Sequence, residues 1–372
     1  MKILFVLDNG RIGGAEKLML NLAEKIPLRG HEVAILILGK DKSITAFSNK
    51  DIVFLFAARR FKLDIFRFTD VIGARIKEYQ PHVVVTNGFL SYLFTARALK
   101  AIKLKIPKFL IFHTISPFSF RDRVFDFFYL FVLHIFGGQW VILYPEQAKN
   151  IMRRFFLKRK DIKLMRSGVD TAVYAKTSNI PTAVHGYEKN IFTIAHIASL
   201  KPIKNQEALF HGLSIFNTRE KVEWQMFIAG QGEARIREEY GKKLKRLGIY
   251  ERVKFLGVLK DVRELLNVSD VFVLTSLTEA FPLSALEALS MGVPCILPHV
   301  GGCASIVEEG GNGYLIHPKN PVYLARLLGN LYRDKTRLDS LKEYARKTAV
   351  ERFSLDHTVD DLLDLCIKNE AI

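Results

Sequence analysis

Short runs of consecutive apolar residues alternate along the whole chain with longer stretches that mix apolar and charged residues. The runs cover residues 2–7, 32–38, 82–87, 108–113 and 140–144, and then 191–197, 224–230, 253–257, 271–276, 294–298 and 314–318. Because they are continuous rather than alternating, they predict strands buried on both faces of parallel sheets. The segments between them, such as 15–26, have a helical composition, so the pattern predicts doubly wound α/β domains.

The alternation stops between residues 167 and 190, which are polar and rich in turn-forming residues. A chain of 372 residues is also longer than one core usually serves. We therefore predict an N-terminal Rossmann-like domain over 1–166, a linker over 167–190 and a C-terminal Rossmann-like domain over 191–355. Residues 356–372 form a last helix that could cross back to the N-terminal domain. Ligands of such folds bind at the C-terminal ends of the strands, so we expect the two domains to face each other across a cleft that holds the site.

The cysteines and the first residues bear on the compartment. Cys295, Cys303 and Cys366 are too few and too scattered for a disulfide framework, which favours a reducing, cytoplasmic environment. The apolar run before Asp8 is too short for the core of a signal peptide.

The most apolar stretch, 124–144, approaches the ~20 residues of a membrane span. Asp126 and His134 interrupt it, and two adjacent glycines divide it. We expect a buried helix followed by a buried strand. The alternative is a helix whose aromatic face dips into the bilayer interface.

Positive charge is concentrated in the first half of the chain. Residues 1–166 contain 29 Lys and Arg against 13 Asp and Glu, whereas residues 167–372 contain 26 against 25. One basic cluster comprises Lys100, Lys103, Lys105 and Lys108, and another lies in 149–166 with Phe155, Phe156 and Leu157 interleaved. The asymmetry indicates an anionic partner, and basic side chains beside apolar ones suit an anionic membrane leaflet. We find no nucleic-acid-binding module, so no nucleic acid partner is expected.

Two polar segments follow predicted strands in the N-terminal half. Gly13 and Gly14 open a helix, where backbone N–H groups and the positive end of the helix dipole suit a phosphate. The segment lacks the GxGxxG pattern, so a dinucleotide is not indicated, and a tight turn would give the same glycines. His113 ends the strand over 108–113 at the ligand-binding edge, although a lone histidine is more often structural.

The strongest signal is the segment 278–289. Glu279 follows a buried strand, Pro282 suits the first turn of a helix, and Glu287 lies on that helix. The two carboxylates bracket a helix N-terminus, which attracts phosphate while the carboxylates accept hydrogen bonds from hydroxyl groups. Phosphate together with two polyol groups describes a nucleotide sugar. Lys201 or Lys204, after the first strand of this half, could neutralise its diphosphate.

Taken together, these segments resemble the family 4 retaining glycosyltransferases of the GT-B fold, of the type found in bacterial polysaccharide and lipopolysaccharide biosynthesis. The resemblance runs from Lys2 to the end of the chain, and Glu279 with Glu287 looks like the family's E-x7-E motif. Further matching segments are 13–16, 167–170, 229–232, 253–257, 292–294 and 301–302.

The resemblance implies catalytic roles for His113, Lys204 and Glu279, and a donor-binding role for Glu287. His113 would contact the transferred sugar, and Lys204 would balance the diphosphate. Glu279 would bind sugar hydroxyls, and Glu287 would bind the ribose.

The same resemblance implies that backbone groups bind the donor. Gly13 and Gly14 would approach the donor phosphate and sugar. Backbone N–H groups near Leu283, Ser284 and Ala285 would hold the distal phosphate. Val258 and Leu259 would flank the base.

Three positions depart from the family pattern. Ser199 stands where arginine is common, Ser305 where an acidic residue is frequent, and Ala280 where glycine is usual. Lys201 could replace the missing arginine. These departures keep open a catalytically silent scaffold of the same fold.

We therefore expect a retaining hexosyltransferase that needs no cofactor, and no metal because the chain has no DxD sequence. We expect UDP to be the nucleotide of the sugar donor, because UDP-sugars are the commonest donors. The expected acceptor is a membrane-associated or lipid-linked saccharide for cell-surface polysaccharide, reached from the inner face of the cytoplasmic membrane. The alternative is an enzyme acting on a soluble sugar or sugar phosphate.

Overall fold

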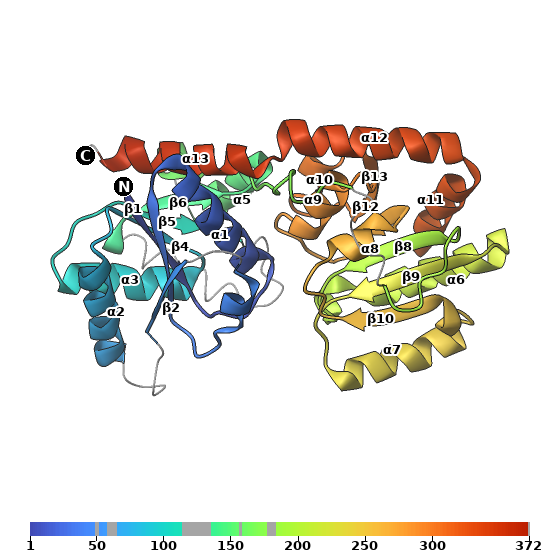
Figure 1. Ribbon diagram of the computed structural model, residues 1–372, viewed down its shortest axis with the longest axis horizontal. Coiled ribbons are helices and arrows are strands. Elements are labelled where there is room, and N and C mark those ends of the chain that lie inside the picture. The colour runs from blue at the N-terminus through green and yellow to red at the C-terminus, as the bar shows by residue number, and fades with distance from the viewer. Residues whose placement is uncertain (49–51, 58–64, 114–134, 156–157, 177–183, 371–372) are drawn as a thin grey trace. The chain divides into compact units, whose positions relative to one another are not determined.

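The apolar runs form two parallel sheets in the computed structural model, which describes residues 1–48, 52–57, 65–113, 135–155, 158–176 and 184–370 (Figure 1). The chain divides into two units. Unit 1 comprises Met1–Gly168 and Leu355–Ile372, and unit 2 comprises Val169–Ser354.

The sheet of unit 1 has the strand order β3-β2-β1-β4-β5-β6-β7 within the described residues, and each pair of neighbouring strands is parallel. The strands are β1 (Lys2–Leu7), β2 (Glu32–Ile37), β3 (Val53–Phe56), β4 (Val83–Thr86), β5 (Lys108–Ile111), β6 (Gln139–Ile142) and β7 (Ile162–Leu164). The helices and short 3-10 turns are α1 (Gly14–Lys25), η1 (Ile26–Arg29), η2 (Ser43–Phe47), α2 (Ile65–Tyr79), α3 (Phe89–Ala101), α5 (Pro145–Phe155) and η3 (Arg159–Asp161). The order of the central strands is that of a doubly wound fold, as the sequence predicts.

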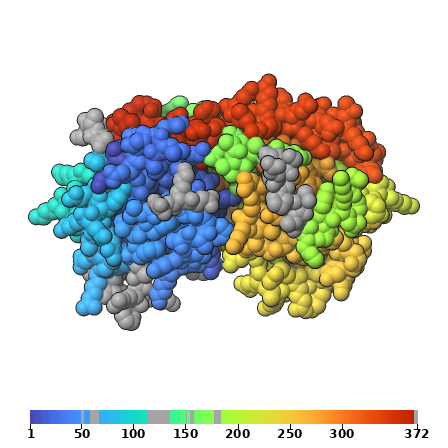
Figure 2. Space-filling model, in the orientation of Figure 1, coloured from blue at the N-terminus to red at the C-terminus, as the bar shows by residue number. Residues whose placement is uncertain are grey.

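The last helix, α13 (Leu355–Glu370), belongs to unit 1 and lies beside α1. Its acidic side chains pair with basic ones of the unit. Arg29 reaches Asp356 at 3.0 Å and Asp360 at 3.4 Å, and Arg166 reaches Asp361 at 3.1 Å. Figure 2 shows the red surface of this helix next to the blue surface of the first elements. An acidic helix therefore covers part of a basic unit.

Unit 2 has the strand order β10-β9-β8-β11-β12-β13, again with parallel pairs. Its strands are β8 (Phe192–Ile197), β9 (Trp224–Ala229), β10 (Val253–Gly257), β11 (Val271–Val273), β12 (Cys295–Pro298) and β13 (Gly313–Ile316). Its helices and turns are η4 (Pro202–Lys204), α6 (Gln206–Glu220), α7 (Ala234–Arg246), η5 (Tyr250–Arg252), α8 (Arg263–Asn267), α9 (Leu283–Ser290), α10 (Cys303–Ile306), α11 (Pro321–Arg333) and α12 (Lys335–Arg352).

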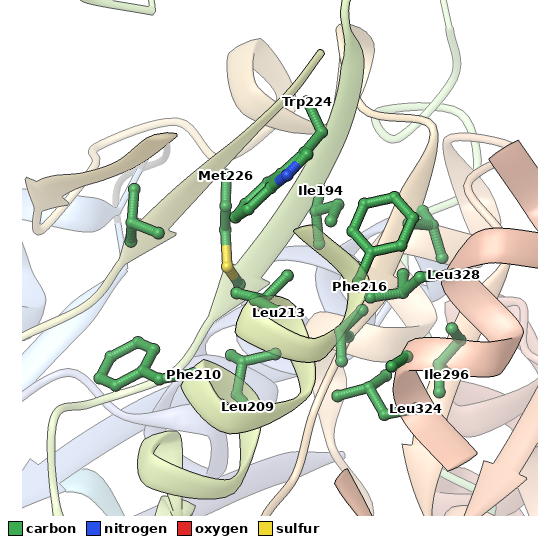
Figure 3. Packing of buried hydrophobic residues seen from close by; sticks show 14 of the residues in the cluster. Ile194, Leu209, Phe210, Leu213, Phe216, Trp224, Met226, Ile296, Leu324 and Leu328 are labelled. Carbon is green, nitrogen blue, oxygen red and sulfur yellow. The ribbon is translucent and has the colours of Figure 1, made fainter. Parts of the chain in front are cut away.

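The core of unit 2 lies between its sheet and the helices α6 and α11 (Figure 3). Trp224 on β9 and Phe216 on α6 are almost fully buried, with ring centroids 5.9 Å apart. Leu324 and Leu328 of α11 complete this layer. Burial of aromatic rings of this size stabilises the folded unit by ~2–3 kcal/mol each through removal from water. The loops at the strand ends therefore extend from a stably packed sheet.

The apolar stretch 124–144 is described only in part, because residues 114–134 lie outside the described residues. Its last part forms β6, in which Trp140 is buried. None of the helices in the described segments is long and apolar enough to cross a bilayer.

Candidate active site

The C-terminal ends of β8 and β11 bring two separate segments together in unit 2. β8 leads into residues 198–205, and β11 leads into residues 274–282. The two strands are neighbours in the sheet, so their loops meet at one edge. Lys204 Nζ lies 2.7 Å from Glu279 Oε1 although the residues are 75 positions apart. The structure thus pairs two of the predicted catalytic side chains.

Glu279 is held from two sides. Only 7% of the residue is exposed, and its Oε1 also accepts a hydrogen bond from Ser276 Oγ at 2.6 Å. A buried carboxylate requires such partners because its desolvation is costly. Ser276 was not predicted as a site residue, although it ends the predicted strand 271–276 at the ligand-binding edge.

Asn205 fixes the backbone next to Lys204. It adopts a left-handed conformation with φ 51°, which asparagine tolerates better than most residues. Its Nδ2 donates to the carbonyls of Thr275 at 3.1 Å and Pro318 at 2.8 Å. Thr275 Oγ1 in turn donates to Asn205 O at 2.9 Å. The lysine-bearing segment is therefore tied to the segment that carries Glu279.

Helix α9 begins next to Glu279 without a side-chain cap. Pro282 is the N-cap, one position before the helix rather than in its first turn. Ala285 N–H donates to Pro282 O at 3.0 Å, so this amide already has a backbone partner in the first turn of the helix. Leu283 and Ser284 are the first two residues of α9, so their backbone N–H groups lie at the positive end of the helix dipole.

Glu287 lies in the middle of α9 and only 4% of it is exposed. Glu279 lies four positions before the first residue of α9, and Glu287 is the fifth of its eight residues. Along the chain, the two buried carboxylates therefore flank the first turn of this helix.

The expected base-binding residues follow β10. Gly257 O accepts from Gly230 N–H at 2.7 Å, which joins the loops after β9 and β10. Gly230 has φ 150°, and a Cβ there would lie 2.0 Å from Ala198 O, so only glycine fits. Val258 is 57% exposed and Leu259 is half-buried. An exposed apolar side chain at a loop edge suits one face of a base.

The positions that depart from the family pattern lie around this site. Ser199 is half-buried, and its carbonyl accepts from Lys201 N–H at 3.0 Å. The side chain of Lys201 is exposed and makes no ion pair within the described part of the chain. Ser305 lies on α10, and Ala280 O accepts from Gly302 N–H at 2.8 Å.

The other predicted residues belong to unit 1. Gly13 is the N-cap of α1, and Gly14 is its first residue, again without a side-chain cap. A Cβ at Gly14 would meet nothing within 4 Å. His113 follows β5 and is half-buried, and burial lowers the pKa of its imidazole to about 4. Its Nε2 has no hydrogen-bond partner among the described residues. The lowered pKa means that the ring is neutral at pH 7, and its Nε2 is buried.

Two carboxylates at the same edge of unit 1 were not predicted as site residues. Asp8 Oδ1 accepts from Ser91 N–H at 2.5 Å in the first turn of α3. Burial raises the pKa of Asp8, and hydrogen bonds with Ser91 partly offset the shift. Burial also raises the pKa of Glu16, to which the charge of Asp8 contributes. The sequence signal was the position of Asp8 directly after the first strand.

No group of three or more His, Cys, Asp or Glu side chains forms a metal site in the segments that the structure describes.

Acidification should destabilise unit 2 through His196, which is fully buried on β8. Its Nδ1 donates to Val273 O at 2.8 Å, and burial lowers its pKa from 6.5 to about 4. Because the folded-state pKa lies below the unfolded one, stability present above pH ~6.5 is lost as the pH falls toward 4, by about 2 kcal/mol at pH 5. The free energy of unfolding should be measured with denaturant at pH 7.5 and at pH 5.0. Between these pH values it should fall by about 2 kcal/mol more in the wild type than in His196→Phe. Equal losses would contradict this assignment.

Comparison with known proteins covers both units. The model described as Glycosyltransferase Family 4 matches residues 12–173, and the model described as Glycosyl transferases group 1 matches residues 182–348. The putative glycosyltransferase EpsD of Bacillus subtilis is 26% identical over 61% of this chain and 62% of its own length. The UDP-Gal:alpha-D-GlcNAc-diphosphoundecaprenol alpha-1,3-galactosyltransferase of Escherichia coli is 26% identical over 69% and 68%. The first three curated relatives are matched over only 22%, 62% and 17% of their lengths.

Solved structures resemble the chain over nearly its whole length. Anabaena HepE in complex with UDP-glucose has a TM-score of 0.85 at 21% identity, over 99% of this chain and all of that chain. Sucrose-phosphate synthase from Thermosynechococcus elongatus has a TM-score of 0.81 at 16% identity, over the full length of both chains. At these identities the likeness shows the fold, which is GT-B. With the two family models matched one after the other along the chain, the protein belongs to the family 4 glycosyltransferases.

Proposed function

We propose that the protein is a retaining, metal-independent hexosyltransferase that moves a sugar from a UDP-sugar to a lipid-linked saccharide in cell-surface polysaccharide synthesis. The observation that carries this proposal is the Lys204–Glu279 pair beside the uncapped start of α9, the helix that bears Glu287. A cation, an anion-binding helix end and two buried carboxylates match a diphosphate flanked by two polyol groups. HepE was solved with UDP-glucose, and the E. coli relative is named for a UDP-sugar and a diphosphoundecaprenol acceptor, which supports both choices.

The reaction breaks the bond between the anomeric carbon and the oxygen of the β-phosphate. Negative charge then develops on the leaving UDP, where Lys204 and the amides of Leu283 and Ser284 would stabilise it in the transition state. The acceptor oxygen bonds to the same face of the anomeric carbon, and its proton passes to the leaving phosphate. Neutral His113 would hydrogen-bond a hydroxyl of the transferred sugar without adding a charge.

A basic edge of unit 1 supports the membrane location. The segments that precede β5, β6 and β7 lie at one edge of the sheet because these strands are parallel neighbours. Exposed basic residues there are Lys100, Lys103, Lys105, Lys158, Arg159 and Lys160. Leu104 and Ile135 are 36% and 46% exposed among them, while Phe156 and Leu157 lie outside the described residues. Basic and apolar side chains together suit an anionic leaflet.

Co-sedimentation with vesicles tests the membrane location. Binding should require anionic lipid and weaken with salt. Replacing Lys103, Lys105 and Lys160 with Glu should weaken it at least ~100-fold, since each basic residue contributes about 1 kcal/mol near the surface. The matched control replaces the exposed lysines Lys189, Lys319 and Lys335 of unit 2 and should bind as the wild type does. Equal loss in both triple variants, or binding to neutral vesicles alone, would refute a specific basic edge.

The reaction itself is tested with a UDP-sugar panel and two acceptors, a diphosphoundecaprenol-linked sugar and a soluble sugar phosphate, in EDTA. We expect transfer to the lipid-linked acceptor, undiminished by EDTA, with the anomeric configuration of the donor kept in the product by NMR. Transfer to the soluble acceptor alone would favour the alternative substrate class.

A further inference from the structure

The segment from Ser199 to Lys204 has little regular structure of its own, yet it carries the lysine of the site. It contains only the one-turn η4. Leu200 N–H donates to Gln231 O at 2.7 Å, and Asn205 anchors the far end. Leu277 N–H also donates to Ile203 O at 2.9 Å. At the near end, the carbonyl of Ser199 is held in addition by a buried side chain.

That side chain is Gln206, the first residue of α6, which has no exposed surface. Its Nε2 donates to Ser199 O at 3.0 Å and lies 3.3 Å from His196 Nε2. Its Oε1 accepts from Tyr240 OH at 3.3 Å. Both ends of the carboxamide are therefore engaged.

The donor and the acceptor of each hydrogen bond among Tyr240, Gln206, His196 and the Val273 carbonyl can be assigned. His196 Nδ1 must donate to Val273 O, because a carbonyl only accepts. His196 Nε2 is then the acceptor of the second N–H of Gln206. Tyr240, Gln206 and His196 thus form one satisfied chain, in which the carboxamide has a single orientation.

We propose that Gln206 is a positioning residue that holds Ser199, and through it Lys204, in the arrangement that receives the donor diphosphate. This role rests on the proposed function of Lys204. Gln206 itself does not touch the donor. Gln206 hydrogen-bonds the Ser199 end of the segment, and Asn205 anchors the Lys204 end. His196 and Tyr240 keep the carboxamide of Gln206 oriented toward Ser199. Small displacements of a charged group from its working position reduce catalysis strongly.

A second buried glutamine of the same unit provides a matched control. Gln225 on β9 is 4% exposed. Its Nε2 donates to Glu188 O at 2.6 Å and Thr193 Oγ1 at 3.0 Å, and its Oε1 accepts from Glu188 N–H at 3.0 Å. It lies near the N-terminal ends of β8 and β9, away from the site. Gln206→Met and Gln225→Met therefore remove equivalent hydrogen-bond networks at opposite ends of the strands of one sheet.

The test compares the two variants by UDP affinity and by amide hydrogen exchange of residues 199–204 without ligand. Both variants should lose stability. Only Gln206→Met should raise the Kd for UDP at least tenfold and speed exchange in this segment by a similar factor. Unchanged exchange in Gln206→Met, or the same effects in Gln225→Met, would overturn the positioning role. Failure of the wild type to bind UDP would instead contradict the proposed function, while the exchange result still decides whether Gln206 orders the segment.

Discussion

Glu279→Gln should lower the rate of sugar transfer at least ~100-fold and leave the protein folded. The substitution keeps the shape and the hydrogen bond from Ser276 but removes the negative charge that Lys204 contacts at 2.7 Å. Losing one preorganised polar group at a reaction centre typically lowers the rate ~10²–10³-fold. Single-turnover transfer from UDP-sugar measures the effect.

Glu220→Gln is the matched control for this experiment. Glu220 is also a largely buried carboxylate, with 14% of its side chain exposed, and Arg333 lies 2.7 Å from it. This ion pair joins the last residue of α6 to the last residue of α11, whereas the site segment 198–205 precedes the first residue of α6. The control should transfer sugar at the wild-type rate. Full activity in Glu279→Gln would show that Glu279 has no part in the reaction and would favour the silent scaffold.

Lys204→Met should lower kcat/KM at least ~100-fold and weaken UDP binding about tenfold. The lysine is the cation that would meet the developing charge of the leaving diphosphate. Without it, the buried carboxylate of Glu279 keeps the hydrogen bond from Ser276 but loses its cation, so some stability should also be lost. Steady-state kinetics and UDP calorimetry measure the two effects.

Lys342→Met separates the catalytic effect from the loss of an ion pair. Lys342 is exposed to 25%, compared with 23% for Lys204, and pairs with Asp270 at 2.9 Å. This control should lose stability but keep kcat/KM. Because Lys204 and Glu279 are in contact, the double variant should be less impaired than the product of the two single losses. Equal losses of activity in Lys204→Met and Lys342→Met would contradict a specific role for Lys204.

The sequence predicted the central strands well because they are buried on both faces and therefore continuously apolar. It did not predict β3 and β7, which are the edge strands of unit 1. β7 has the sequence IKL, so a charged residue interrupts it and it shows no apolar run. β3 lies in the apolar run of residues 52–57, which we did not assign to a strand, and Val53 at its start is 51% exposed. The family 4 membership and the GT-B fold were also predicted correctly, on the strength of the Glu279 and Glu287 spacing.

The supporting contacts of the site could not be predicted. Lys204 and Glu279 were recognised separately, but their pairing depends on β8 and β11 being neighbours. Ser276, Asn205 and Gln206 act through carbonyl and carboxylate groups 3–113 positions away along the chain. Such contacts leave no periodic pattern in the sequence. The engaged amide of Ala285 likewise depends on where α9 begins.

The most direct test of the central claim is a thermal-shift panel of nucleoside diphosphates and nucleotide sugars against the wild type and Glu287→Gln. A ligand at 100 times its Kd stabilises the folded protein by ~2.7 kcal/mol, which is readily detected. We predict a selective shift with UDP or a UDP-sugar that is lost or strongly reduced in Glu287→Gln. The absence of a shift with any nucleotide in the panel would contradict a donor site in unit 2.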